Sequence, residues 1–158
     1  MFNGALVPAA LRRKAGPERE PPSRPPTMQV SPMPRGVIDV ETEIRNALTA
    51  LGDIARTRCI ELQMVVEPDL TAEADLGCQA CLRDVLAAAI GRAESGVLAS
   101  AMRRGDSVAI EVLDDGATAP AGIILLPEPG ALSKGASITA EHQPDRGTRV
   151  VLCLSFPR

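Results

Sequence analysis

The spacing of apolar residues changes character along the chain, and this change restricts the fold more than any other feature of the sequence. Residues 41–57 and 78–90 place apolar side chains at helical intervals, whereas residues 60–66 alternate apolar and polar side chains as a half-buried strand does. Five more short strands are predicted, at 97–102, 108–112, 122–126, 136–141 and 148–156. This order predicts an α+β fold, a two-layer sandwich of a mixed β-sheet with two main helices on one face.

Local signals refine this outline. Asp39 precedes the first helix and is a candidate cap for it. Residues 68–75, PDLTAEAD, are predicted to form a loop between the first strand and the second helix. Residues 142–147, HQPDRG, are predicted to form the loop of the last hairpin.

The first 36 residues differ in composition from the rest of the chain. Seven of the nineteen residues from 17 to 35 are proline, and most of the others are polar. Such a segment cannot bury enough apolar surface to fold. We therefore expect residues 1–36 to be a disordered Pro/Arg-rich tail and residues 37–158 to be the folded domain. A docking arm is the alternative role for the tail.

Composition excludes several classes of partner. The chain contains two Phe and no Trp or Tyr, so its core must be aliphatic and it lacks aromatic platforms for stacking bases. Residues 1–36 carry a formal charge of +4 and residues 37–158 one of −7, so the expected domain is acidic. An acidic surface does not attract a phosphate backbone, and we expect no nucleic-acid partner.

Hydropathy and the order of the N-terminal residues bear on localisation. No apolar run approaches the roughly 18–20 residues of a membrane span. The basic residues near the N-terminus follow its short apolar stretch, whereas in a secretory signal they precede it. We expect a cytoplasmic protein without a membrane partner and with its four cysteines reduced.

The segment EVLDDGATAP, residues 111–120, combines a strand end, two carboxylates and a glycine. A carboxylate in this position can accept a hydrogen bond from the exocyclic amine of adenine. The same residues also suit an ordinary hairpin turn, because Asp and Gly are favoured in turns. A third interpretation, acid–base catalysis by Asp114 and Asp115, is disfavoured because the sequence offers no His partner or activated nucleophile nearby.

Several segments together resemble a known family. VIDVETEIRNALTALGDIA, RDVLAAAIGRA, VAIEVLDDGATAP and GASITAEHQPDRGTRVVLCLSFP are similar, in order and spacing, to the ATP-binding domain of bacterial histidine kinases, a member of the GHKL superfamily with the Bergerat fold. The resemblance covers residues 37–157. It implies ATP or ADP with Mg²⁺ as the cofactor.

The resemblance also implies which residues bind the nucleotide. Asp114 and Gly116 match the adenine-contacting Asp and the first glycine of its box. Asp84 stands where the family has an early Asn or acidic residue of the first box, and it offers one oxygen ligand. Thr148 belongs to the Gly-Thr step of the last hairpin. No catalytic residue and no metal ligand are assigned.

The chain departs from the family where phosphates and Mg²⁺ are held. Ala88 replaces the Asn that helps to hold Mg²⁺, and Thr118 replaces the second glycine of the adenine box. Only 30 residues separate Gly116 from Gly147, which leaves little room for the family's lid and its second Gly-rich box. The chain therefore resembles a degenerate member of the family.

These departures lead to two hypotheses about function. In the first, the domain is a regulatory protein-binding module of two-component signalling, with a sensor kinase or response regulator as partner, weak or lost nucleotide binding and no independent catalysis. A homodimer is a further hypothesis. In the alternative, the chain is a minimal ATP-binding domain that works with a partner kinase or phosphotransfer protein. A third, weaker hypothesis places the acceptor His of a phosphotransferase on a partner.

Two other sets of residues are candidate sites. Cys78 and Cys81 form a CxxC that could join Cys59 and Cys153 in a zinc site, but both lie on the apolar stripe of a helix, where Cys packs as a small hydrophobe. His142 is the chain's single His, and its surroundings do not match the family's acceptor box. We interpret it as a solvated loop residue.

Overall fold

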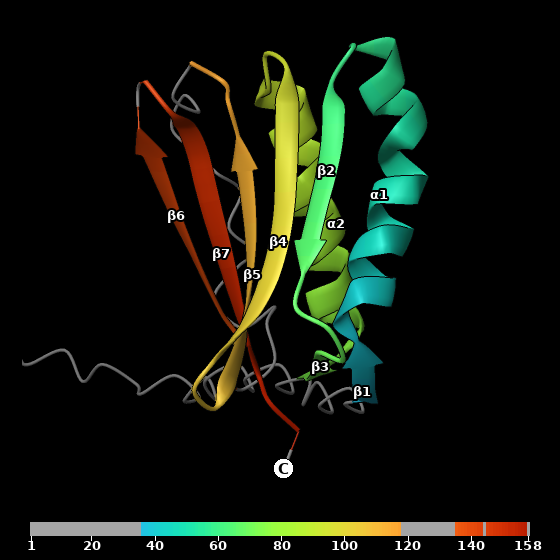
Figure 1. Cartoon of the computed structure of the whole chain (residues 1–158), viewed down its shortest axis with the longest axis vertical. Helices are drawn as coiled ribbons and strands as arrows, with labels where there is room; N and C mark the ends of the chain where they lie inside the picture. Colours follow the sequence, from blue (N-terminus) through green and yellow to red (C-terminus); the bar gives the residue numbers. More distant parts are fainter. Residues whose placement is uncertain (1–35, 118–134, 144, 158) are drawn as a thin grey trace, which may run out of the picture. The chain divides into compact units, whose positions relative to one another are not determined.

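The computed structural model describes residues 36–117, 135–143 and 145–157. Their elements are β1 (Gly36–Asp39), α1 (Val40–Thr57), β2 (Glu61–Val66), β3 (Thr71–Ala74), α2 (Leu76–Arg92), β4 (Gly96–Arg104), β5 (Ser107–Asp114), β6 (Ser137–Gln143) and β7 (Gly147–Ser155) (Figure 1). Apart from Gly36, the predicted tail lies outside the described residues, as does the strand predicted at 122–126.

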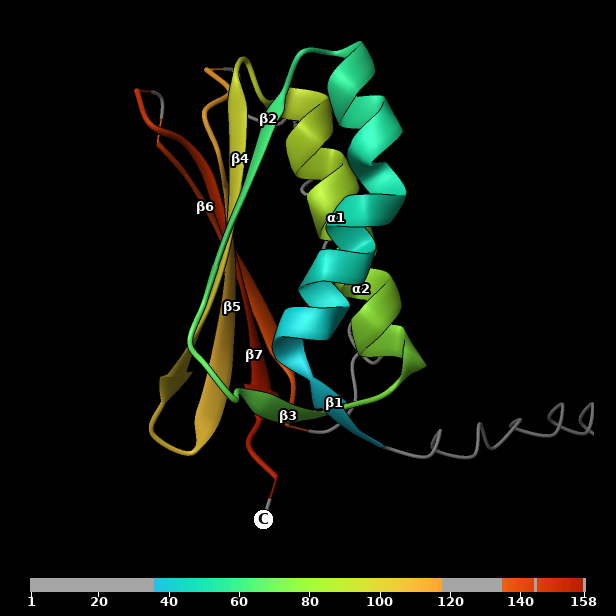
Figure 2. The same cartoon turned by 45° about the vertical axis from the view of Figure 1, so that its right-hand side comes forward.

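The seven described strands form one mixed sheet. The strand order is β1-β3-β7-β5-β4-β2, with β6 beside β7. Among these strands β2 and β4 pair in parallel, and the other pairs are antiparallel. Both helices cover the same face of the sheet (Figure 2). The predicted α+β sandwich is confirmed.

Both helices begin at an aspartate cap. The Asp39 carboxylate accepts the Thr42 backbone N–H at 2.7 Å and starts α1, as predicted. The Asp75 carboxylate accepts the Cys78 backbone N–H at 2.9 Å and starts α2. Each cap satisfies a backbone donor that has no partner within its helix, which typically contributes about 1 kcal/mol.

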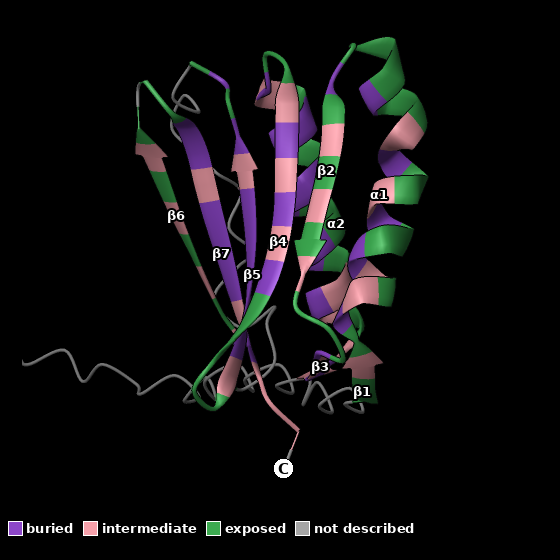
Figure 3. Ribbon diagram, viewed as in Figure 1, coloured by how far each residue is buried: buried purple, intermediate pink, exposed green. Residues whose placement is uncertain are grey.

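The core lies between the helices and the face of the sheet that they cover. Its largest members are aliphatic, and each is at most 1% exposed: Ile44, Leu86, Ile90, Ile110 and Leu154. Figure 3 shows buried residues alternating with more exposed ones along β4, as a strand with one packed face requires. Full burial of such side chains contributes about 1.5–3 kcal/mol each. Phe156 packs only at the margin of the core.

The loop predicted at residues 68–75 is wrong in part, because Thr71–Ala74 form β3. This strand is short and lacks bulky β-formers, so its sequence resembles a loop. It forms because β1 pairs with it antiparallel, with Gly36 opposite Ala74, and because Ala72 and Ala74 face the core. The signal is tertiary pairing, which local pattern does not reveal.

The loop prediction for His142 is also wrong. His142 lies in β6 and pairs with Thr148 of β7. The pairing of these two strands continues to Gln143 opposite Gly147. The hairpin loop is therefore shorter than the loop predicted at residues 142–147. This register places His142 beside the candidate site.

Candidate functional site

The strand register places three polar residues in one row near the end of the sheet. Asp114 of β5 pairs with Thr148 of β7, and Thr148 also pairs with His142 of β6. Val112 and Val150, the preceding pair on the same face, belong to the core. Because alternate residues of a strand share a face, the polar row faces the helix layer.

Asp114 is the carboxylate of this row, and 1% of its side chain is exposed. Its Oδ2 atom accepts hydrogen bonds from Nη2 of Arg92 at 2.7 Å and from Nε of Arg92 at 3.1 Å. Its Oδ1 atom accepts the Gly116 backbone N–H at 3.2 Å. Arg92 ends α2, and its side chain is 14% exposed.

A buried carboxylate needs hydrogen-bond donors, and here the protein supplies them itself. The guanidinium of Arg92 lies where an external donor to Asp114 would otherwise bind. An adenine amine that approached Asp114 would therefore compete with a charge-assisted pair in a region of low solvent exposure.

Two glycines allow the backbone to close around Asp114. A Cβ atom on Gly116 would lie 2.4 Å from the carbonyl oxygen of Arg92, and one on Gly147 would lie 1.7 Å from the carbonyl oxygen of Asp114. Gly147 also has φ of +85°, which favours glycine. Backbone packing alone therefore requires glycine at both positions, and a role for Gly116 in nucleotide binding stays a prediction.

Thr148 is 1% exposed and does not present its hydroxyl to solvent. Its Oγ1 atom lies 3.1 Å from Nδ1 of His142, within hydrogen-bonding distance. The side chain that the resemblance assigned to nucleotide binding is thus engaged with a neighbouring strand. His142 is half-buried by this arrangement.

Asp84 does not join the other three predicted residues. It lies on α2, eight residues before Arg92, which corresponds to about 12 Å along a helix. Asp84 and Ala88 are both exposed, and they share the helix face that ends at Arg92. The structure thus gathers Asp114, Gly116 and Thr148 and leaves Asp84 two turns away.

Asp115 has a structural role that the sequence did not indicate. Its carboxylate accepts the backbone N–H groups of Glu94, Ser95 and Gly96, at 2.9 to 3.2 Å, and the Ser95 hydroxyl. The Ser95 hydroxyl, followed by these backbone N–H groups, holds the pKa of Asp115 well below its usual range. The hydrogen bonds of the Asp115 carboxylate therefore hold the turn between α2 and β4 against the end of β5.

The contact between Arg92 and Asp114 was not predicted from the sequence. The available signal was a basic residue in the last turn of a predicted helix, a common position because cations are favoured at helix C-termini. Nothing in that signal indicates a contact with Asp114, 22 residues later. The pairing depends on how α2 packs against β5.

A cavity of about 320 Å³ lies on the other side of the same sheet end. Its lining includes Gln63, Leu98, Leu113 and Arg146, together with Asp114 and Asp115. Leu113 points away from the helix layer, because it neighbours Asp114 on β5. Of the polar row, Asp114 lines this cavity, whereas Thr148 and His142 do not.

The cysteines and the other metal-binding side chains do not form a second site. Cys78 and Cys81 are buried in the core, as their helical spacing predicted, and burial raises the pKa of Cys81 to about 11. Within residues 36–117, 135–143 and 145–157, no three side chains of His, Cys, Asp or Glu gather as a metal site would require. No helix in this part of the chain is long and apolar enough to span a membrane.

Comparison by sequence finds no relative: no protein-family model and no curated protein matches the chain. Comparison of structures finds proteins with a similar fold. The nucleotide-free catalytic domain of histidine kinase ThkA superposes with a TM-score of 0.64 at 16% identity, over 78% of this chain and 98% of that one. Histidine kinase AdeS of Acinetobacter baumannii has a TM-score of 0.62 at 14% identity, over 81% and 70%.

A third similar structure holds a partner protein. ThkA in complex with the response regulator protein TrrA matches with a TM-score of 0.61 at 15% identity, over 78% of this chain and 42% of that one. These likenesses define the fold. The chain has the fold of histidine kinase catalytic (ATPase) domains, as the sequence motifs implied.

Proposed function

We propose that this chain is a regulatory protein-binding module of two-component signalling, in which nucleotide binding is weak or lost. One observation carries the proposal: the Asp114 carboxylate, which the family resemblance assigns to adenine, is buried and bonded by Arg92 and by the Gly116 N–H. Ala88, at the position of a Mg²⁺-holding Asn, offers no ligand atom. A domain so altered keeps a kinase-type surface without the nucleotide chemistry.

The partner in this proposal is a sensor kinase or a response regulator. A structure of the same fold, ThkA, is in complex with a response regulator protein, which supports a partner of that kind. The proposed location is the cytoplasm, where both classes of partner would be met. Homodimerisation is part of the proposal, and static light scattering of the purified chain would test it.

The test uses binding and unfolding measurements on the unmodified chain. Purified receiver domains and kinase cytoplasmic segments from the same organism would be titrated by calorimetry, and thermal unfolding would be followed by circular dichroism with and without Mg·ATP or Mg·ADP. We expect binding to a signalling protein and no nucleotide-dependent shift. Failure to bind any receiver domain or kinase segment would overturn the proposal.

The alternative is a minimal ATP-binding domain that serves a partner kinase or phosphotransfer protein. The gathering of Asp114, Gly116 and Thr148 favours it, as does the exposed carboxylate of Asp84. A nucleotide-dependent shift that Asp114→Asn abolishes would decide for this alternative. Because Asp114 also pairs with Arg92, each variant must be compared with its own ligand-free midpoint.

A further inference from the structure

We propose that the face of the sheet opposite the helices binds an oxyanion, such as the carboxylate of an acidic side chain, on the guanidinium groups of Arg104 and Arg149. Both helices cover the other face, and within the described residues no helix lies over this one, which we call the open face (Figure 2). The inference goes beyond the proposed function, and its test needs no signalling partner.

Glu111 brings the two arginines together. It stands on β5 between Ile110 and Val112, which belong to the core, so its side chain points to the open face. Its Oε1 atom accepts hydrogen bonds from Nη2 of Arg104 at 2.5 Å and from Nη2 of Arg149 at 2.6 Å. Its Oε2 atom accepts one from Nε of Arg149 at 3.3 Å. Two guanidinium groups therefore meet at one carboxylate oxygen.

The carboxylate is buried, whereas both arginines remain accessible. The side chain of Glu111 is 10% exposed, against 50% for Arg104 and 38% for Arg149. A guanidinium has five N–H donors, and the contacts with Glu111 use one donor of Arg104 and two of Arg149. Both side chains thus have further donors with which to bind an oxyanion that arrives from solvent.

The charges at this position favour one added anion. Two guanidinium groups share the single carboxylate of Glu111, which leaves an excess of one positive charge within a domain that is acidic as a whole. Glu141 of β6 is exposed and pairs with Arg149 across the strands, so it offsets part of this excess. The site should therefore become stronger when the charge of Glu141 is removed.

Aliphatic side chains lie beside the two arginines. Across the strands, Arg149 is opposite Leu113, which is opposite Leu98 of β4. Val151 is opposite Glu111 and is only 9% exposed. Charge-assisted hydrogen bonds are stronger where apolar neighbours limit the access of water. An acidic side chain flanked by apolar residues therefore suits the open face better than a fully hydrated ion does.

The experiment is an NMR titration of the isotope-labelled, unmodified chain at constant ionic strength. The probes are inorganic phosphate, the peptide acetyl-Leu-Glu-Leu-amide and its uncharged counterpart acetyl-Leu-Gln-Leu-amide. We expect the glutamate peptide to cause saturable shifts in the backbone amide and Nε–H signals of Arg104 and Arg149. Phosphate should do the same at higher concentration, and the glutamine peptide should not.

The relative affinities identify the source of the anion. Tighter binding of the glutamate peptide assigns the site to an acidic side chain of a partner protein, and tighter binding of phosphate assigns it to a free anion. The inference is wrong if neither probe causes saturable shifts at the two arginines, or if the glutamine peptide binds as well as the glutamate peptide.

Arg104→Gln tests the residues of the site. It should weaken binding by roughly fivefold or more, because one of the two guanidinium groups is lost. The variant should fold, because Arg149 still donates to both oxygens of Glu111. Arg83→Gln is the matched control: it removes an exposed arginine of α2, and it should bind as the unmodified chain does. Unchanged affinity in Arg104→Gln would overturn the inference.

Glu141→Gln provides a second measurement, which decides if Arg104→Gln does not fold. Glu141 is exposed, and its strand pairs only with β7 among the described strands, so the substitution should leave the fold intact. We expect the affinity to rise by about twofold, because a carboxylate that repels the anion is lost. An unchanged or lower affinity would count against the site. The proposed function is tested separately with receiver domains and kinase segments, so its outcome is independent of this one.

Discussion

A Cβ atom on Gly147 would stand 1.7 Å from the carbonyl oxygen of Asp114, and no rotation of a side chain could relieve that contact. The first residue of β7, Gly147, thus packs directly against the end of β5, next to the Asp114–Thr148 pair of the polar row. Strand register, the position of Thr148 and the carboxylate of Asp114 all depend on this close approach.

Gly147→Ala should be strongly destabilising for this reason. Its φ of +85° and the backbone clash act together, and we expect a loss of at least about 2 kcal/mol in the free energy of unfolding. Urea denaturation followed by circular dichroism measures it. Gly105→Ala is the matched control, because Gly105 has φ of +60° but open space around its Cβ position, and it should lose about 1–2 kcal/mol. Equal losses in both variants would contradict the clash.

Arg92→Ala should cost about 3 kcal/mol or more, because it leaves the buried Asp114 carboxylate without its cation. Asp114→Ala should also destabilise, and the double variant should lose less than the sum. A double-mutant cycle from urea denaturation should give a coupling free energy of about 1–3 kcal/mol. If the losses of the two single variants simply add up in the double variant, the Arg92–Asp114 pair has no coupling free energy.

Asp115→Asn should weaken the turn between α2 and β4 in a pH-dependent way. The pKa of Asp115 is lowered in the folded chain, chiefly by the Ser95 hydroxyl, so the ionised form stabilises the fold. That contribution is complete above the unfolded pKa of 3.8 and is lost as the pH falls toward the lower folded value. The difference in thermal midpoint between the unmodified chain and Asp115→Asn should therefore be largest at neutral pH and shrink below about pH 4.

A matched control for that titration is Asp53→Asn. Asp53 forms an exposed ion pair with Arg56 on α1, and its loss should change the free energy of unfolding by less than about 0.5 kcal/mol. A pH-independent effect of Asp115→Asn would indicate that the charge of Asp115 is unimportant.

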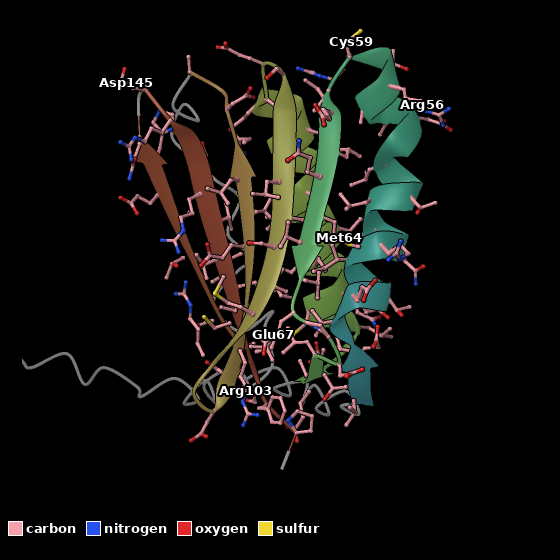
Figure 4. All side chains as sticks on the ribbon, in the orientation of Figure 1. Arg56, Cys59, Met64, Glu67, Arg103 and Asp145 are labelled. Carbon is pink, nitrogen blue, oxygen red and sulfur yellow. The ribbon has the colours of Figure 1, made fainter. Side chains whose placement is uncertain are left out.

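The cysteines should differ widely in reactivity toward iodoacetamide. Cys59 is exposed and projects from the end of α1 (Figure 4), so it should be labelled first in the native chain. Cys81 is buried and its pKa is raised to about 11, so little reactive thiolate is present at neutral pH. Mass spectrometry of time points should find Cys81 modified only after unfolding. Early labelling of Cys81 would show that α2 opens readily.

Periodicity predicted both helices and most of the sheet because those elements bury one regular face. The helical stripe that includes Leu86 and Ile90 and the alternation around Ile110 are local patterns with a direct structural meaning. β3 escaped prediction because four small or polar residues become a strand only when β1 pairs with them.

The candidate site was predictable only in part. Asp114, Gly116 and Thr148 were found through a family pattern, and strand pairing brings them together. The contact that decides their chemistry, Arg92 with Asp114, joins a helix end to a strand end across 22 positions of sequence. Neither composition nor spacing encodes which of the chain's arginines reaches that carboxylate.

The direction of the strands has a practical consequence for studying this domain. β1 begins, and β7 ends, at the opposite end of the sheet from Asp114, as Figure 1 shows. The eight residues of β5 span about 25 Å between those ends. A fluorescent protein or an affinity handle attached before β1 or after β7 would thus be anchored a full strand length from the Arg92–Asp114 pair.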